Sequence, residues 1–413
     1  MSTSKRVTII GAGFSGLTSA FYLERAGYQV EIFEASQRAG GLIATLKTPN
    51  GLIETAANGL INSALVEELF SSLNVPLIGT KRSARRRFIF RGGRAHRWPL
   101  GVVASIRVSV FLFRLIFDRR AVMPGDDESI SKWGERTLGV EASQFLVNTA
   151  LQGIYAGDPS RMSASLILGR FFKRSPKPAS PKIRGSVTPP QGMQQLIDGL
   201  EAHLRRRGVM ITYSSHFEIS MRTGQQPVIV ATNPRSAADI VQSVSPRKSE
   251  LLRHIEMSSV ITTTAFFDRT DASTEGFGIL FAPVERTRAL GVLKNNFIFE
   301  NRATTQFSET WIQGGALANP DLNTQTDEQV IDGIVNERST AFHLSERPTS
   351  AVTTRWPQGI PHYTLDLQKM IPDLKSSEQN IFLMGNYLGD LGLAKILERA
   401  SRLPDRLAKE AKW

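Results

Sequence analysis

The chain has 413 residues, 41% of them hydrophobic, no cysteine, and a formal net charge of +12. Its length exceeds what one hydrophobic core normally serves, so we expect a globular protein of two or three domains. The absence of cysteine excludes disulfides, cysteine-ligated metal sites, cysteine nucleophiles and a cysteinyl bond to a cofactor, and no metal site is predicted.

The first predicted unit, Val7 to Glu34, has the pattern of a dinucleotide-binding fold. A β-branched strand leads into three glycines at Gly-x-Gly-x-x-Gly spacing, a helix follows, and a second strand ends in an acidic residue. In this pattern the glycines permit the turn, the approach of a diphosphate and close helix–strand contact, while the acid accepts hydrogen bonds from ribose hydroxyls. The predicted cofactor contacts here are Gly11, Gly13, Phe14, Ser15, Gly16, Glu34 and Ala35.

An R-x-G-G turn follows the acid at close range and favours FAD over NAD. It resembles the signature of flavin oxidases of the amine oxidase superfamily, in which this turn contacts the diphosphate and the flavin. Near the other end, residues 380–386 predict a strand entering a glycine turn, and residues 389–400 a helix whose N-terminus faces the flavin. The resemblance implies noncovalent FAD with further contacts at Arg38, Gly40, Gly41, Leu42, Gly385, Leu391, Gly392 and Leu393.

Basic residues are concentrated between residues 81 and 97. Such a patch suits a nucleic acid, an anionic lipid or a carboxylated substrate. The sequence carries no recognition-helix or RNA-binding signature, so nucleic acid is not an expected partner, and for most of these side chains we expect a solvated surface. The cluster comprises Lys81, Arg82, Arg85, Arg86, Arg87, Arg91, Arg94 and Arg97.

The most apolar run, Pro99 to Phe117, is barely long enough to span a bilayer and contains Arg107 and Arg114. Their spacing places both arginines on one helical face. This pattern fits a helix lying in a membrane interface or over a hydrophobic channel, and it fits a buried helix pair equally well. The opposite, apolar face would carry Val108, Phe111, Leu112 and Leu115.

Beyond this run, the chain is predicted to leave the nucleotide fold and return to it. Residues 126–168 have a helical pattern interrupted at 153–163, residues 173–190 predict a loop, and residues 191–207 predict a helix. The last four of the predicted strands should form an antiparallel sheet. The strands are expected over 209–213, 227–232, 260–268, 276–282, 290–295 and 310–314.

We therefore predict an α/β protein with a discontinuous Rossmann-type FAD-binding domain, an α+β antiparallel-sheet substrate domain and a helical, membrane-associating domain. The discontinuity follows from cofactor motifs at both ends of the chain. The expected segments are FAD-binding parts at 1–85, 191–240 and 356–413, substrate-domain parts at 86–98 and 241–355, and the helical domain at 99–190.

Further motifs resemble the protoporphyrinogen and coproporphyrinogen oxidases of haem biosynthesis over nearly the whole length. They are R-F-I-F-R-G-G (87–93) followed by Pro99, Y-A-G-D-P-S-R-M-S (155–163), G-F-G (276–278) and W-P-Q-G-I-P-H-Y (356–363). The resemblance implies that the flavin takes hydride from a methylene bridge of a porphyrinogen, with oxygen as acceptor and porphyrin and hydrogen peroxide as products. The protein mainly orients the two partners in such chemistry, so no catalytic side chain is assigned.

The same resemblance assigns substrate contacts and one more cofactor contact. Arg87 corresponds to an arginine that pairs with a propionate, which suits the fork of a guanidinium. Phe277 corresponds to an aromatic ring that stacks on a pyrrole, and Leu280 to an apolar contact. Gly157 corresponds to a glycine that lets the backbone approach the macrocycle, and Trp356 to a cofactor contact.

Four positions depart from the family pattern. Ala56, in E-T-A-A-N-G, stands where the family has glycine and would narrow the space over the flavin. Ala394 and Lys395 replace an Asn-Asp pair, and His362 replaces a glutamine and either accepts a proton or fills space.

Several alternatives stay open at this point. The substrate is either protoporphyrinogen or coproporphyrinogen, and a homodimer is neither indicated nor excluded. The rival functions are an amine oxidase or desaturase type of flavoenzyme and a flavin-binding scaffold without turnover. Because the first strand begins too near Met1 for a secretory segment, we expect a cytoplasmic protein, with peripheral contact to the cytoplasmic face of a membrane as the alternative.

Overall fold

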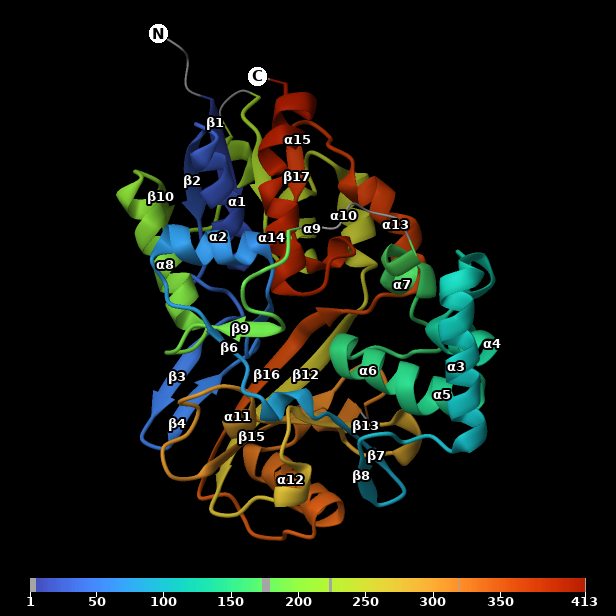
Figure 1. Cartoon of the computed structure of the whole chain (residues 1–413). Coiled ribbons are helices and arrows are strands. Elements are labelled where there is room, and N and C mark those ends of the chain that lie inside the picture. Colours follow the sequence, from blue (N-terminus) through green and yellow to red (C-terminus); the bar gives the residue numbers. More distant parts are fainter. Residues whose placement is uncertain (1–4, 173–178, 223–224, 319, 413) are drawn as a thin grey trace.

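The computed structural model describes residues 5–172, 179–222, 225–318 and 320–412, and segments far apart in the sequence share its upper sheet (Figure 1). Within the described residues this parallel sheet has five strands in the order β10-β2-β1-β11-β17. The predicted return of the chain to the first nucleotide-binding unit is therefore confirmed. The strands are β1 Arg6–Ile10, β2 Gln29–Phe33, β10 Met210–Thr212, β11 Val228–Val230 and β17 Ile381–Leu383.

Helices cover both faces of this parallel sheet. Val7 and Ile9 pack in a core with one helical layer, whereas Val228 and Val230 pack in a second core with the other layer. Strands buried on both faces are accordingly almost continuous runs of apolar residues. The first layer is α1 Phe14–Arg25, α2 Ala64–Leu73, α8 Gln194–Arg206, α14 Leu393–Ser401 and α15 Leu403–Glu410; the second is α9 Pro234–Val241, α10 Pro246–Arg253 and α13 Leu365–Lys375.

A larger sheet lies below the first in Figure 1. In the described part of the chain it has seven strands in the order β16-β12-β15-β14-β13-β7-β8, and α12 Asp327–Phe342 packs against one of its faces. The four strands predicted to form an antiparallel sheet, β12 to β15, do pair antiparallel, whereas β7, which was not among them, runs parallel to β13 and makes the sheet mixed. The strands are β7 Phe88–Arg91, β8 Arg94–His96, β12 Met257–Phe267, β13 Gly278–Phe281, β14 Ala289–Lys294, β15 Phe307–Gly314 and β16 Ser350–Pro361, with the short helix α11 Asn295–Ile298 after β14.

Two small sheets connect these parts. A hairpin pairs β3 Thr45–Thr48 with β4 Gly51–Glu54, and β9 Ser186–Thr188 lies between β5 Leu60–Ile61 and β6 Ile78–Gly79. The strand β9 corrects the predicted loop over 173–190, although residues 173–178 lie outside the described residues.

The helical segment packs beside the large sheet, at the right of Figure 1. Its α6 helix contacts the face of the large sheet that α12 leaves uncovered, with Gly153 against Leu280. In the part of the chain that the structure describes, none of the helices combines the length and hydropathy that spanning a bilayer requires. The helices are α3 Val102–Phe117, α4 Ile130–Leu138, α5 Val140–Ala142, a π-helix Ser143–Asn148, α6 Thr149–Tyr155 and α7 Ala164–Phe172.

Candidate cofactor and substrate site

A cavity of about 920 Å³ opens where the parallel strands of the upper sheet end, and we call it the cofactor cavity. Ligands of open α/β sheets bind at this edge, outside the carboxyl ends of the strands. Most of the residues predicted to contact the cofactor line it: Gly11, Gly13, Phe14, Ser15, Glu34, Ala35, Gly40, Gly41, Leu42, Trp356, Gly385 and Leu393.

The glycines bring three backbone segments together at the start of α1. The Gly40 amide donates to the Ala12 carbonyl at 2.8 Å, and a β-carbon on Gly13 would lie 3.9 Å from the Gly41 α-carbon. No described side chain caps the N-terminus of α1, so its first amides point into the cavity mouth without a side-chain acceptor. This arrangement suits the diphosphate of a dinucleotide.

Gly16 lies behind the cavity rather than in its wall. A β-carbon at this position would lie 1.9 Å from the Gly11 carbonyl oxygen, so only glycine permits α1 to pack this closely on the end of β1. The role predicted for Gly16 as a packing glycine agrees with this geometry.

Glu34 lies at the end of β2, with its carboxylate facing the cofactor cavity. One carboxylate oxygen accepts the Ala12 amide at 2.7 Å, and the other accepts the Ser36 amide at 2.8 Å. The Ser36 hydroxyl donates to the second oxygen as well, so these bonds fix the carboxylate and leave further acceptor capacity on the oxygen that accepts the Ala12 amide. The geometry fits an acceptor for ribose hydroxyls.

Arg38, Leu391 and Gly392 were predicted to contact the cofactor, but the structure does not place them in the wall of the cavity. The guanidinium of Arg38 donates to the carbonyls of Ala39, Ile43 and Gly41, so it holds the glycine turn in shape. Gly392 begins α14, with φ of 94°, and its carbonyl accepts the Ile396 amide. From this helix Leu393 and Ile396 line the cofactor cavity.

Sequence reasoning missed a second helix that begins at the cofactor cavity. Asn233 caps α9 by accepting the Ser236 amide at 3.0 Å, and Pro234 occupies the first turn. The sequence T-N-P after the strand β11 is a cap signal that could have identified this helix start. Further lining residues missed are Ser215, His216, Phe217, Thr232, Met257, Pro357, Gln358, Gly359 and Asn386.

The predicted substrate residues fall into two groups. Arg87, which precedes β7, stacks its guanidinium over the Phe277 ring at 4.6 Å from the centroid, and the Phe277 amide donates to the Arg86 carbonyl. Leu280 follows on β13 and packs against Gly153 of α6. Arg87 and Phe277 thus lie together where β7 and β13 begin, and Leu280 lies farther along β13; none of the three lines the cofactor cavity.

Gly157 has different neighbours. It is buried, and a β-carbon there would lie 2.5 Å from the Met162 sulfur and 2.9 Å from the His362 ring. Met162 and His362 occupy the space that the missing β-carbon leaves, so this glycine serves close packing on that side, and the contact of its backbone with a macrocycle stays a prediction.

His362 has a structural role. The Asp158 amide donates to its Nε2 at 3.0 Å, so the neutral ring carries its proton on Nδ1, which faces Glu256 at 3.4 Å. Arg161 pairs with Glu256 at 2.5 Å, and this bond holds the pKa of the Glu256 carboxyl below its usual range. Through His362, these hydrogen bonds connect the loop after α6 to the end of β16. This arrangement favours the space-filling interpretation of His362 over proton transfer.

Comparison with known proteins now decides the family. The profile described as flavin containing amine oxidoreductase matches residues 14–392, which is most of the chain. The chain belongs to this family.

Two relatives of this amine oxidoreductase are named for porphyrinogen chemistry. Coproporphyrinogen III oxidase of Bacillus subtilis is 23% identical, with 96% of each chain covered. Human protoporphyrinogen oxidase is 24% identical, with 87% of this chain and 88% of the human protein covered.

The comparison with solved structures shows a similarity of fold only. A candidate protoporphyrinogen oxidase from Exiguobacterium matches with a TM-score of 0.79 at 18% identity, covering 98% of this chain and 99% of that one. A putrescine oxidase variant matches with a TM-score of 0.76 at 14% identity, covering 98% and 99%.

This amine oxidoreductase is a flavin-dependent oxidoreductase, and FAD is its cofactor. The residues present fit the group, because the glycine cradle, the uncapped start of α1 and the Glu34 carboxylate suit the diphosphate and ribose. Leu42 and Trp356 line the part of the cavity nearest the large sheet and would contact the ring system.

Residues 54–58, which include Ala56, join the two sheets of the amine oxidoreductase. The indole of Trp356 and the hydroxyl of Thr262 both donate to the Thr55 carbonyl, at 2.8 and 3.1 Å. The Asn58 amide donates to the Asn295 side chain at 3.0 Å. The methyl of Ala56 is exposed and outside the cavity wall, so it does not narrow the cofactor cavity.

A buried ion pair anchors the start of this segment. Arg302 donates to Glu54 at 2.8 Å, and the side chains are each 2% exposed. Thr45 and the Met193 amide also donate to Glu54. Burial raises the pKa of the Glu54 carboxyl, although the guanidinium of Arg302 opposes this shift.

Proposed function

We propose that this oxidoreductase converts a porphyrinogen to the porphyrin in haem biosynthesis, with oxygen as the final acceptor. The observation that carries the proposal is the pair of Arg87 and Phe277 beside β13, a cation joined to an aromatic platform. A porphyrinogen offers the two complementary features, carboxylates and a broad apolar ring system. Relatives named for this chemistry along nearly the full length support it.

In this proposal the protein binds and orients the substrate. Arg87 is exposed and has no acidic partner among the described residues, so its guanidinium is available to a propionate. Phe277 would stack on a pyrrole, and Leu280 would contact the apolar edge of the ring. When bound, FAD supplies the acceptor for hydride, and no protein side chain has to form a covalent bond with the substrate.

The proposal predicts porphyrin formation under air. The purified FAD-loaded protein, supplied with coproporphyrinogen III or protoporphyrinogen IX, should raise porphyrin fluorescence faster than buffer and heat-inactivated protein do. Rates at the autoxidation background with both substrates, from protein that holds FAD, would exclude porphyrinogen oxidation.

Replacing Arg87 with alanine should raise KM by about tenfold while kcat stays within about twofold. A charge-assisted hydrogen bond contributes about 1.5–3 kcal/mol, and partial exposure of Arg87 places the effect at the lower end. Initial rates across a substrate series measure both constants. Arg85→Ala, which removes an exposed arginine of the same cluster, is the matched control. An unchanged KM would remove Arg87 from the substrate site.

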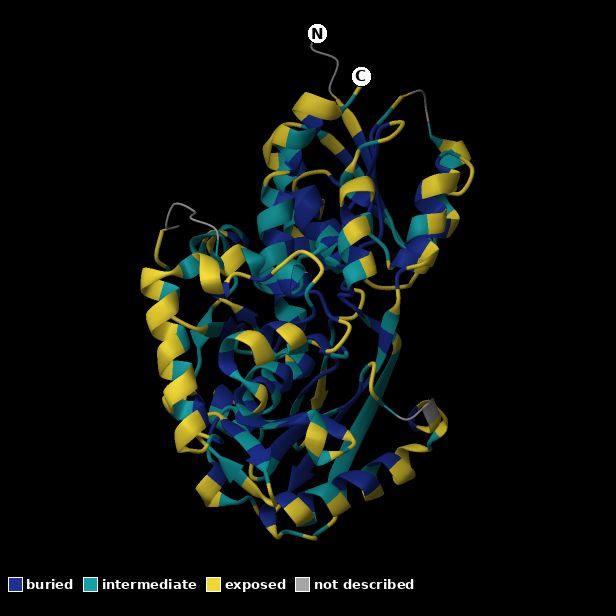
Figure 2. Cartoon of the chain, turned by 90° about the vertical axis from the view of Figure 1, so that its right-hand side faces the viewer, coloured by how far each residue is buried: buried dark blue, intermediate teal, exposed yellow. Residues whose placement is uncertain are grey.

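We also propose that the protein is cytoplasmic and contacts a membrane through α3. The helix packs Val108 and Phe111 inward, and Figure 2 shows exposed residues along the rest of its length. An exposed apolar stripe at helical spacing suits burial in a membrane interface. The stripe consists of Val103, Ile106, Val110, Phe113 and Phe117, which are between 47% and 71% exposed.

The membrane contact predicts binding to vesicles of phosphatidylglycerol and phosphatidylcholine. The triple change Ile106→Ser, Phe113→Ser and Phe117→Ser should weaken cosedimentation at least about tenfold, because each side chain loses apolar burial in the lipid. Met210→Ser with Met221→Ser changes exposed apolar residues elsewhere and should leave binding unaltered. Equal binding by the wild-type and triple-variant proteins would contradict the proposal.

A further inference from the structure

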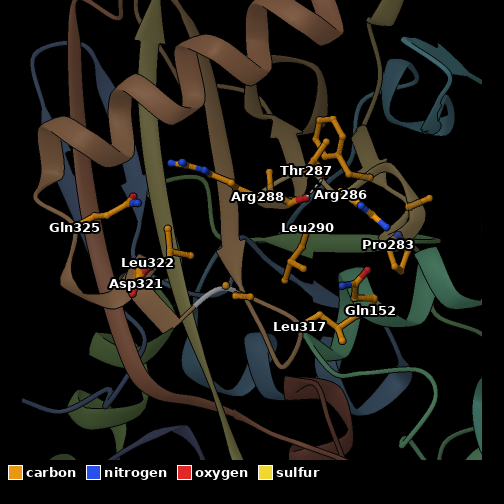
Figure 3. Close-up of a pocket in the computed structure, with 15 residues that line it drawn as sticks. Gln152, Pro283, Arg286, Thr287, Arg288, Leu290, Leu317, Asp321, Leu322 and Gln325 are labelled. Carbon is orange, nitrogen blue, oxygen red and sulfur yellow. Dashed lines mark hydrogen bonds between the residues drawn. The ribbon is translucent and has the colours of Figure 1, made fainter.

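A second cavity, of about 300 Å³, lies at the far end of β13 from Arg87 and Phe277, and we call it the distal cavity. Figure 3 shows it between the ends of strands of the large sheet and α6. Its size is at the lower limit for a small-molecule site, so it suits one side chain of a ligand rather than a whole macrocycle. Phe281, Leu290 and Leu317 supply apolar walls, while Gln152, Arg286 and Arg288 supply polar groups.

Gln152 is a buried polar side chain without a partner. The residue is 6% exposed, and its side-chain amide forms no hydrogen bond with any described residue. In Figure 3 this amide points into the cavity, toward the side from which Arg286 enters. The amide atoms themselves are open to the space of the cavity, so they are available to hydrogen-bond a polar ligand.

Arg286 is held at the cavity in a strained conformation. Its backbone is left-handed, with φ of 54° and ψ of 31°, which is uncommon for a residue with a β-carbon. The Glu285 carboxylate accepts the Gly92 amide at 3.0 Å, and Glu337 accepts the Ala289 amide at 3.2 Å, so both sides of the turn are fixed. In the described part of the chain neither Arg286 nor Arg288 forms an ion pair. Asp321 also lines the cavity, and the charge of Arg288 acts on the Glu337 carboxyl, where it opposes the rise in pKa that burial causes, so Arg286 is the cation that faces an anionic ligand most directly.

An apolar cluster links a residue that lines the distal cavity to the strand that reaches the cofactor cavity. Leu290 packs in one apolar cluster with Ala156 and Val260, and Ile360 packs against that cluster. Gly359, the neighbour of Ile360 in sequence, lines the cofactor cavity.

The two cationic positions lie at opposite ends of one apolar strand. Phe277 precedes β13 and Phe281 ends it, a separation of about 13 Å at about 3.3 Å per residue. Leu280 lies between them on the face that packs against α6. Arg87 at one end and Arg286 at the other therefore match a flat molecule with carboxylates at two opposite edges.

We propose that Arg286 and Gln152 bind a propionate on the edge of the macrocycle opposite the edge held by Arg87, which makes coproporphyrinogen III the substrate. The inference rests on the proposed function, which leaves the choice of porphyrinogen open. Protoporphyrinogen IX carries its two propionates on one edge and vinyl groups on the other, whereas coproporphyrinogen III carries propionates on both edges. A cation and an unpaired amide at the second edge recognise a carboxylate and not a vinyl group.

The test compares kcat/KM for the two porphyrinogens in wild-type protein and in Arg286→Gln, Arg286→Lys and Arg206→Gln. Arg206, an exposed arginine at the end of α8, is the matched control. We expect wild-type protein to prefer coproporphyrinogen III. Arg286→Gln should lower kcat/KM for coproporphyrinogen III about fivefold, which is the effect of losing an exposed charge pair. The value for protoporphyrinogen IX should change less than about twofold. Arg286→Lys should recover part of the loss, and Arg206→Gln should match wild type.

The outcomes separate this inference from the proposed function. Three results would overturn the inference and leave porphyrinogen oxidation standing. They are an equal effect of Arg286→Gln on kcat/KM for both substrates, no effect on kcat/KM for coproporphyrinogen III, and turnover of protoporphyrinogen IX alone. Background rates for both substrates in FAD-loaded wild-type protein would overturn the proposed function, and the assignment of the distal cavity with it.

Discussion

Replacing Arg302 with methionine is expected to lower the free energy of unfolding by about 3–5 kcal/mol, the usual cost of leaving one partner of a buried ion pair alone. The carboxylate of Glu54 would remain 2% exposed without its cation. The change also removes the bonds from Arg302 to the Thr188 hydroxyl and the Asn58 carbonyl. The 54–58 segment would lose its anchor, so FAD affinity should fall as well.

The stability defect of Arg302→Met should grow as pH rises. Burial already raises the pKa of the Glu54 carboxyl in the wild-type protein, and Arg302 is the main opposing influence. Without the guanidinium, the folded-state pKa rises further above the unfolded value. A group shifted in this direction stabilises the fold below its unfolded pKa, and this contribution is lost as pH rises through the folded pKa. The variant is therefore expected to be closer to wild type at pH 5 than at pH 8.

Denaturant titrations followed by tryptophan fluorescence at both pH values measure this effect. Glu54→Met combined with Arg302→Met should recover part of the lost stability, because replacing both charges with apolar groups leaves no unpaired ion. Arg94→Met, at an exposed arginine of β8, controls for the loss of a positive charge. A loss below about 1 kcal/mol at pH 8 would contradict the assigned role of the ion pair.

The nucleotide-binding unit could be predicted because its information is local. Three glycines, two strands and an acidic residue lie within residues 7–34, and their spacing in the sequence is enough to predict the unit. The Arg302–Glu54 pair could not be predicted in this way, since its members are 248 residues apart. Nothing in the residues around Arg302 distinguishes it from the many arginines on the surface.

The parallel pairing of β7 with β13 and the strand β9 were missed for a related reason. Each strand is only three or four residues long, and a short apolar run does not determine the direction of its partner. The expected boundary at residue 356 also falls inside β16, which spans Ser350–Pro361 and belongs to the large sheet. Trp356 can line the cofactor cavity because this long strand reaches the cavity from the other sheet.

Motif resemblance predicted residue identity better than residue environment. It assigned a substrate contact to Arg87 and another to Phe277, and the structure places these two residues side by side because both adjoin strands that pair with each other. It could not predict the surroundings of Gly157, because the space beside a glycine depends on distant side chains, here Met162 and His362. It also could not reveal the distal cavity, whose walls come from three strands, α6 and the segment after β15.

Gly13→Ala should weaken cofactor binding without destabilising the fold, whereas Gly16→Ala should destabilise the fold and abolish cofactor binding. At Gly13 the backbone has φ of −70° and ψ of 176°, which alanine adopts freely, and the new methyl would meet only the Gly41 α-carbon at 3.9 Å. The apo protein should keep its stability within about 0.5 kcal/mol, a typical effect of an unstrained surface change. The methyl would stand where the diphosphate approaches the backbone, so FAD affinity should fall roughly hundredfold.

At Gly16 the new methyl would lie 1.9 Å from the Gly11 carbonyl oxygen, and backbone has to move to relieve this overlap. We expect at least about 3 kcal/mol of destabilisation, at the upper end of overpacking effects, together with loss of FAD. Gly101→Ala is a matched control, because Gly101 begins α3 with φ of −71° and ψ of 175° and lies away from the cofactor cavity. Urea titration of the apo proteins and flavin fluorescence titration measure the two effects separately. If the Gly13→Ala protein bound FAD as tightly as the Gly101→Ala protein does, the diphosphate would not lie against Gly13. If Gly13→Ala unfolded the apo protein, the separation of cofactor binding from folding at this position would be wrong.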